Sequence, residues 1–98
     1  MKVRFRSNQL RRCYEDENLA YRAWGRAVGE QYLNKVTRIL DAPALSDLFD
    51  LRSLRLHPLR GGRQGQYAMT LVGRWRLIIS VAEDETIVIE EVSNHYDQ

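Results

Sequence analysis

The residues best suited to chemistry lie close together in the sequence, between Leu54 and Arg76. This stretch contains no acidic residue, and its histidine and arginines are His57, Arg55, Arg60, Arg63, Arg74 and Arg76. Arginine carries a planar guanidinium that can bond a phosphate through two N–H groups and can stack on a base. Tyr67 and Trp75 lie among the arginines and could stack on bases as well. These residue types predict a surface that binds a polyanion, and they favour RNA over a membrane.

Charge is unevenly distributed along the chain. Residues 1–51 contain nine basic and seven acidic residues, residues 52–82 contain six arginines and no acid, and residues 83–98 contain six acids and no base. The three segments therefore carry +2, +6 and −6, although the whole chain carries only +2. The basic segment should attract a polyanion in a salt-dependent way, and it should equally attract an acidic protein. The alternative is a solvated basic surface, with Tyr67 and Trp75 in the core.

Size and composition predict one domain that spans residues 1–98 and has an ordinary hydrophobic core. Apolar residues make up 44% of the chain and charged residues 29%. The sequence has neither an apolar run of about 18 residues nor a signal-peptide pattern, so we expect a cytoplasmic protein that does not enter a membrane. Cys13 is the only cysteine and the two histidines are far apart, which excludes an internal disulfide and gives no zinc-binding spacing. We expect no metal and no cofactor.

The N-terminal half is predicted to form a strand and two long helices. Apolar and basic residues alternate over residues 3–6, as in a short strand at a sheet edge. Ser7 or Asn8 can cap a helix that continues to Gly25, where it should end. Residues 26–40 form a second helix with one apolar stripe. The two helices should pack as an antiparallel hairpin against the sheet formed by the C-terminal half.

The C-terminal half is predicted to form an antiparallel meander of three strands, after a short helix over residues 44–49. The strands are expected at residues 66–72, 75–81 and 87–92. Pro58 excludes a central strand position for its own segment, which should place His57 near the surface. In the middle strand, Arg76, Ile78 and Ser80 should point away from the apolar row of Trp75, Leu77, Ile79 and Val81. The predicted fold class is therefore α+β, with the helices packed on one face of a mostly antiparallel sheet.

Three short motifs resemble those of a known family of bacterial toxins. They are Leu-His-Pro-Leu-Arg-Gly at residues 56–61, Gly-Arg-Trp-Arg-Leu-Ile at residues 73–78, and Val-Ser-Asn-His-Tyr at residues 92–96. Together with the order of the elements, they resemble the RelE/ParE superfamily, and within it the HigB or "plasmid maintenance killer protein" branch. The resemblance covers nearly the whole chain and implies a RelE-like fold.

The same resemblance implies a function and a set of partners. The family member would be the toxin of a type II toxin–antitoxin system, a ribosome-dependent endoribonuclease that cleaves mRNA and inhibits translation. Its partners would be the ribosome, mRNA and a HigA-like antitoxin with a helix-turn-helix domain. The toxin–antitoxin complex would bind operator DNA through the antitoxin.

The resemblance also points to catalytic residues. His57 falls on the histidine of the first motif, Arg76 on the arginine that begins the family's central strand, and His95 on the C-terminal histidine. Tyr96 follows His95 and could stack on a base or assist proton transfer. Asn94 departs from the family, because many relatives carry an acid in this motif. An asparagine can orient His95 by hydrogen bonding but cannot stabilise its cation.

These residues could support RNA cleavage without a metal. The reaction needs a base for the 2′-hydroxyl, an acid for the leaving 5′-oxygen and a cation at the phosphate. His57 and His95 suit the base and the acid, in an order that the sequence leaves open, and Arg76 suits the cation. Arg55, Arg60, Arg63 and Arg74 would bind the RNA backbone. In the structural alternative, the histidines contact nothing, Tyr96 caps the core, and Arg76 pairs with Glu90 or Glu91.

Two other functions remain compatible with the sequence. A ParE-like toxin that inhibits gyrase shares the predicted fold and needs no histidine pair. A non-catalytic RNA-binding module is the second alternative, and Asn94 is the feature that favours it.

Overall fold

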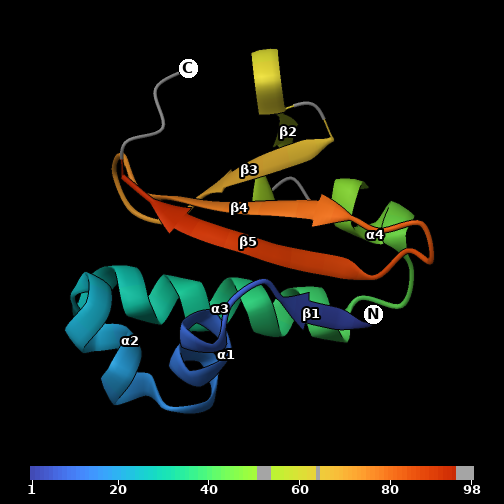
Figure 1. Cartoon of the computed structure of the whole chain (residues 1–98). Helices are drawn as coiled ribbons and strands as arrows, with labels where there is room; N and C mark the ends of the chain where they lie inside the picture. The colour runs from blue at the N-terminus through green and yellow to red at the C-terminus, as the bar shows by residue number, and fades with distance from the viewer. Residues whose placement is uncertain (51–53, 64, 95–98) are drawn as a thin grey trace.

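The computed structural model describes residues 1–50, 54–63 and 65–94. Its central element is a twisted five-stranded sheet. The strands lie in the order β1-β5-β4-β3-β2. Helices α1, α2 and α3 lie together on one side of the strands (Figure 1). In chain order the elements are β1 (Val3–Phe5), α1 (Asn8–Glu15), α2 (Glu17–Trp24), α3 (Arg26–Asp41), α4 (Leu45–Asp50), β2 (His57–Pro58), the 3-10 turn η2 (Gly61–Arg63), β3 (Gln66–Thr70), β4 (Arg76–Val81) and β5 (Ile87–Ser93).

The helix expected between Ser7 and Gly25 is two helices, and the prediction of one continuous helix was wrong. Ser7 caps α1 as expected, because its Oγ accepts a hydrogen bond from the Leu10 N–H at 3.1 Å. Asp16 then has an extended backbone, with φ −137° and ψ 106°, and ends α1. Its carboxylate accepts from the Asn18 N–H at 3.0 Å and so caps α2. The side chain of Asp16 thus competes with the helical hydrogen bonds, which apolar periodicity does not detect.

Helices α2 and α3 form the predicted hairpin around Gly25. This glycine has a φ of 86°, a conformation that residues with a Cβ rarely adopt. Gly29 then allows α3 to approach α2 closely, because a Cβ at this position would lie 2.7 Å from Cδ1 of Tyr21. Tyr32 links α3 to α1 by donating its hydroxyl to the Leu10 carbonyl at 2.7 Å. The hairpin therefore presents one joint apolar surface to the sheet.

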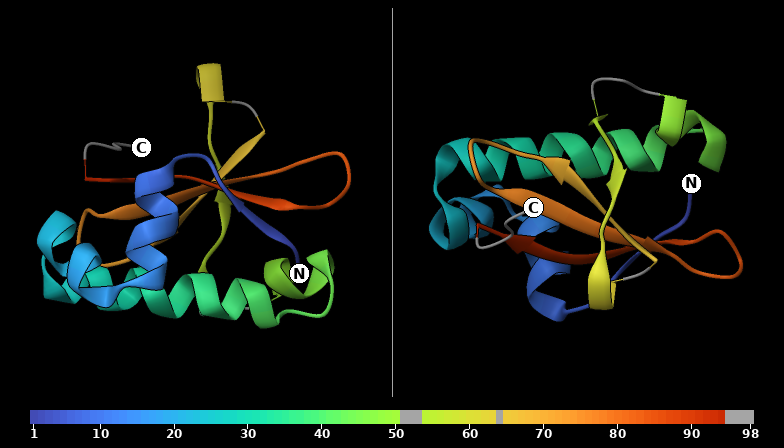
Figure 2. Two further views of the ribbon diagram at one scale, coloured as in Figure 1. Left: turned by 60° about the horizontal axis from the view of Figure 1, so that its bottom comes forward. Right: turned by 90° about the horizontal axis from the view of Figure 1, so that it is seen from above.

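The sheet contains the predicted three-stranded meander and two further strands, one at each edge. Strands β3, β4 and β5 are antiparallel neighbours, and β1 pairs with β5 in parallel at the edge. The two-residue strand β2 forms the opposite edge, in keeping with the restriction that Pro58 imposes. Figure 2 shows that β2 crosses the direction of β4 steeply, as the twist of the sheet requires. Strands β3 and β4 are shorter than predicted, because the Trp75 N–H bonds the Val72 carbonyl at 2.8 Å and closes a turn.

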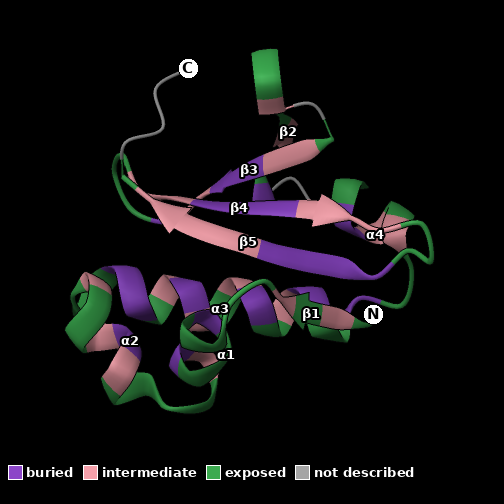
Figure 3. Ribbon diagram, in the orientation of Figure 1, coloured by how far each residue is buried: buried purple, intermediate pink, exposed green. Residues whose placement is uncertain are grey.

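The two faces of the sheet differ in burial, as the alternation in β4 predicts. The helix-covered face belongs to one large core that includes Met69, Leu77, Ile79, Ile87 and Ile89 with buried residues of all four helices. The other side, here called the outer face, has a small buried cluster of Leu59, Ala68 and Ile78. Figure 3 shows buried residues on β3, β4 and β5 and along α3. Within the described ranges, no helix is both long and apolar enough to cross a bilayer.

Candidate functional site

Strand register places the predicted site residues on the outer face. His57 pairs with Ala68, Ala68 with Ile78, and Ile78 with Glu91. Directly paired residues of antiparallel strands point to the same face, so these four side chains form one row across the sheet. Arg76 lies in the neighbouring row, two residues from Ile78 on β4. From the spacing of strands and residues, the Cα atoms of His57 and Arg76 are roughly 12 Å apart.

His57 is held by the backbone just before it. Its Nδ1 lies 3.1 Å from the carbonyl oxygen of Arg55. Arg55 has a φ of 49°, which is uncommon for any residue other than glycine. When Nδ1 carries the proton and donates to this carbonyl, Nε2 keeps a free lone pair. The arrangement therefore favours the tautomer in which Nε2 can accept a proton from a ligand.

Arg76 is held by the turn between β3 and β4 rather than by an acid. Its Nη1 donates to the Gly73 carbonyl at 2.6 Å and to the Trp75 carbonyl at 3.0 Å. Among the described residues Arg76 forms no ion pair, so the alternative in which it pairs with Glu90 or Glu91 was wrong. Backbone carbonyls fix the guanidinium without neutralising its charge. Its cation is thus available to an anionic ligand on the outer face.

A β-bulge brings two carboxylates to the outer face, and sequence reasoning did not anticipate this. Ile78 pairs with Glu91 while Ile79 pairs with Ile89, so Glu90 is an extra residue in β5. The Glu90 carboxylate accepts from Ser80 Oγ at 2.6 Å and from Arg6 Nη1 at 2.9 Å. Because Ser80 points to the outer face, Glu90 does so as well. Two consecutive acids in a strand are the only signal in the sequence, and by themselves they would point to opposite faces.

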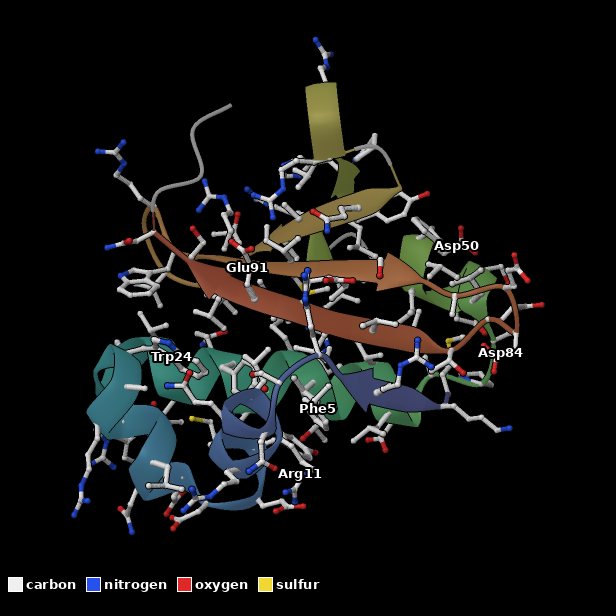
Figure 4. The ribbon with its side chains drawn as sticks, in the orientation of Figure 1. Phe5, Arg11, Trp24, Asp50, Asp84 and Glu91 are labelled. Carbon is white, nitrogen blue, oxygen red and sulfur yellow. The ribbon has the colours of Figure 1, made fainter. Side chains whose placement is uncertain are left out.

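Arg63 reaches over the outer face to the second of these acids. Its Nη2 lies 3.1 Å from Glu91 Oε2, and its Nε donates to Gln66 Oε1 at 2.8 Å. Figure 4 shows Glu91 on the side of the strands away from α3, opposite to Trp24. Arg63 is therefore already engaged by a carboxylate, whereas no described carboxylate pairs with Arg55, Arg60 or Arg74.

The other predicted RNA-binding arginines lie at two places around the sheet. Arg55 and Arg60 are exposed on either side of β2. Arg74 is exposed in the turn between β3 and β4, two residues before Arg76. The basic stretch of the sequence is thus divided into one group at the β2 edge and one group at the β3–β4 turn.

His95 and Tyr96, the other two predicted catalytic residues, lie outside the described residues. Strand β5 ends at Ser93, which pairs with Arg76, and Asn94 is exposed just beyond it. The chain therefore leaves the sheet beside Arg76.

Other chemically versatile side chains are less suitable. Cys13 is buried, and burial raises the pKa of its thiol, which keeps it protonated and a poor nucleophile. Within residues 1–50, 54–63 and 65–94, no group of three histidine, cysteine or acidic side chains is arranged to hold a metal ion.

Comparison with solved structures shows that the fold is similar to that of several bacterial toxins. No protein-family model matches the sequence, and no curated protein matches it either. The structure is similar to a YoeB/ParE toxin from Agrobacterium tumefaciens, with a TM-score of 0.61 and 15% identity over 98% of this chain and 100% of that chain. It is also similar to YoeB in the YoeB–YefM complex from Staphylococcus aureus, with a TM-score of 0.57 and 17% identity over 98% of both chains.

A third similar structure is YafQ from E. coli, with a TM-score of 0.57 and 18% identity over 96% of this chain and 92% of that chain. These likenesses extend over almost the full length of every chain, so they confirm the predicted RelE-like α+β fold. They do not select the HigB branch, which stays a prediction.

Proposed function

We propose that this chain is the toxin of a type II toxin–antitoxin system and acts as an endoribonuclease that cleaves mRNA on the ribosome. The observation that carries the proposal is the placement of His57 and Arg76 on the same face of the sheet, the outer face. The fold shared with YoeB and YafQ supports the toxin role. The exposed arginines around this face supply the positive charge that an RNA backbone requires.

His57 is the general base in this proposal. Its Nε2 removes the proton of the ribose 2′-hydroxyl, and the 2′-oxygen then attacks the adjacent phosphorus. A bond forms between the 2′-oxygen and phosphorus while the bond from phosphorus to the 5′-oxygen breaks, which leaves a 2′,3′-cyclic phosphate. The Arg55 carbonyl supports this assignment, because it favours a proton on Nδ1 and can stabilise the imidazolium that forms.

Arg76 stabilises the charge that develops on the phosphoryl oxygens. Its guanidinium is held by two carbonyls of a tight turn and so needs little reorganisation when the phosphate arrives. Loss of such a donor typically lowers the rate by about 10²- to 10³-fold. His95 would protonate the leaving 5′-oxygen, and Tyr96 would stack on a base or assist this transfer.

The remaining arginines bind the RNA backbone or ribosomal RNA. Arg55, Arg60 and Arg74 are exposed and can bind phosphates directly. Arg63 would have to exchange its carboxylate partner Glu91 for a phosphate. These steps use protein side chains alone.

An antitoxin completes the proposal. YoeB from Staphylococcus aureus has been solved in complex with YefM, and we propose an equivalent antitoxin for this chain. By the sequence resemblance it would be a HigA-like protein with a helix-turn-helix domain, through which the complex binds operator DNA. Both proteins would act in the cytoplasm.

Expression of the chain without an antitoxin in bacteria tests this function. We expect growth arrest together with mRNA cleavage, mapped by primer extension, and loss of both in Arg76→Ala. Arg22→Ala is the control, because Arg22 is an exposed arginine that lies on α2, away from the outer face. Arrest with a DNA damage response and intact mRNA would instead indicate a gyrase inhibitor. Unimpaired growth would indicate a non-catalytic RNA-binding module.

A further inference from the structure

A pocket lies between α1 and α2, which are on the helix-covered side of the sheet (Figure 1). Its volume of about 340 Å³ is in the range of sites that bind small organic ligands. The apolar part of its lining comes from Cys13 of α1 and from Leu19 and Ala23 of α2. Cys13 is only 2% exposed and so forms the floor of the pocket. The pocket can therefore hold a short hydrocarbon group.

The same pocket is positively charged. Arg12 of α1, Arg22 of α2 and the amide of Gln9 complete its lining, and no acid among the described residues lines it. Both arginines are exposed, and neither forms an ion pair within residues 1–50, 54–63 and 65–94. Burial raises the pKa of the Cys13 thiol, and the charge of Arg12 opposes this rise, which places that guanidinium near the floor. An anion in the pocket would meet two cations that lack a partner.

Arg12 differs in this respect from its neighbour Arg11. Arg11 Nη1 lies 2.9 Å from Oε1 of Glu15, one helical turn further along α1. Asp16 has the same spacing from Arg12, so the sequence offers Arg12 an equivalent partner. The Asp16 carboxylate instead accepts from the Asn18 N–H at 3.0 Å, where it caps α2. The break between the two helices thus leaves Arg12 available to an external anion at the pocket.

We propose that the pocket between α1 and α2 binds a free small carboxylate that has a short hydrocarbon chain. The guanidinium groups of Arg12 and Arg22 donate hydrogen bonds to the carboxylate. The hydrocarbon chain packs on Cys13, Leu19 and Ala23, which removes apolar surface from water. A phosphate of an RNA backbone would match the charge but would leave this apolar lining uncovered. The site is separate from the outer face and so goes beyond the proposed function.

The test titrates the full chain with butyrate, hexanoate and octanoate and follows the backbone amide signals by NMR. We expect the shifted signals to belong to α1 and α2. The affinity should rise about fourfold for each methylene group added, because each one buries further apolar surface. Equal affinities along the series would show that charge alone attracts these anions, and shifts confined to other elements would place them elsewhere. Either result would overturn the proposal.

Two pairs of variants separate the charge of the pocket from its shape. Arg22→Ala should weaken octanoate binding about tenfold or more, because it removes a charged donor. Arg4→Ala is its control, since Arg4 is an exposed arginine of β1 that does not line the pocket. Ala23→Phe should abolish binding by filling the pocket. Its control is Ala27→Phe, at an exposed alanine of α3 outside the lining.

Circular dichroism should show that all four variants are folded, because each substitution is at an exposed residue. Octanoate binding that is unchanged in both Arg22→Ala and Ala23→Phe would overturn the proposal. If Ala23→Phe fails to fold, wild-type affinity in Arg22→Ala is sufficient to overturn it.

Discussion

The two faces of the sheet are built from alternate residues of the same strands, yet their side chains differ in burial and in charge. On the helix-covered face, β4 contributes Leu77 and Ile79, which are at most 1% exposed and belong to a core shared with all four helices. On the outer face the same strand contributes Arg76 and Ser80, whose partners are carbonyls and a carboxylate. The difference teaches that the large apolar core depends on one face, whereas the charged side chains of the proposed site lie on the other.

The bulge at Glu90 shows how the outer face is organised. Without it, Glu90 and Glu91 would point to opposite sides, and one carboxylate would enter the apolar core. With it, both acids bind arginines on the outer face, Glu90 through Arg6 and Glu91 through Arg63. The acidic C-terminal strand therefore neutralises part of the basic surface and leaves Arg76 charged.

The largest effect that we expect concerns the histidines. His57→Ala should lower the mRNA cleavage rate about 10²- to 10⁴-fold, because it removes the proposed base. His95→Ala should do the same, and the double variant should lose less than the product of the two losses. Single-turnover cleavage on purified ribosomes measures these rates, and a bell-shaped pH–rate profile in the wild type would support an acid–base pair. Near-wild-type rates in both single variants would place the chemistry on the arginines and Tyr96.

The next effect tests the helix-covered face. Ile79→Ala should lower the free energy of unfolding by about 2–5 kcal/mol, because it leaves a cavity in a closed core. Chemical denaturation measures this loss. Ser80→Ala is the control at the neighbouring position. It should lower the free energy of unfolding much less, because Ser80 is half-buried on the outer face. Equal losses in the two variants would remove the contrast between the faces.

Asp16 offers a smaller test that concerns the helical side alone. Asp16→Ala removes the cap of α2 and should lower the free energy of unfolding by about 1 kcal/mol. Asp16→Asn should keep most of the stability, since its side-chain oxygen can accept from the Asn18 N–H. RNA cleavage should be unaffected in both variants. A stable Asp16→Ala variant would show that the break between α1 and α2 depends on packing rather than on this cap.

The smallest expected effect on stability is at Glu91. The side chains of Arg63 and Glu91 are 35% and 43% exposed, so their ion pair contributes only about 0–1 kcal/mol. Glu91→Gln should leave the melting temperature nearly unchanged and tighten binding to single-stranded RNA, because it releases Arg63 for a phosphate. Filter binding at several salt concentrations measures this change. Unchanged affinity would show that Arg63 does not contact the RNA.

Much of this contrast could be predicted from local sequence patterns. The alternation from Trp75 to Val81 predicted which residues of β4 enter the core, and Pro58 predicted that His57 lies at an edge. Gly25 predicted the end of α2, because its positive φ is needed there. These features depend on the spacing of apolar residues and on the backbone conformations that glycine and proline allow. Both can be read directly from the sequence.

Other features depend on competition or on distant partners, and they were not predictable in this way. Asp16 sits within an apolar helical period, and its carboxylate breaks the helix by bonding a nearby N–H. The partners of Glu90 and Glu91 are Arg6 and Arg63, and their pairing depends on a register shift in β5. The Arg55 carbonyl that faces His57 depends on an uncommon backbone conformation. The contacts of Glu90 and Glu91 therefore depend on tertiary structure, whereas those of Asp16 and His57 are local and depend on the backbone conformation that the chain adopts there.

Neighbouring residues on β4 allow the most direct test of the claim that the outer face carries the function. Cleavage rate and thermal unfolding should be measured for Arg76→Ala and Leu77→Ala in parallel. We expect Arg76→Ala to lose cleavage by about 10²-fold or more while its melting temperature stays within several degrees of the wild type. Leu77→Ala should lose about 2–5 kcal/mol of stability and, at a temperature where it is folded, cleave normally. An Arg76→Ala variant that cleaves like the wild type, or that unfolds as Leu77→Ala does, would contradict the account.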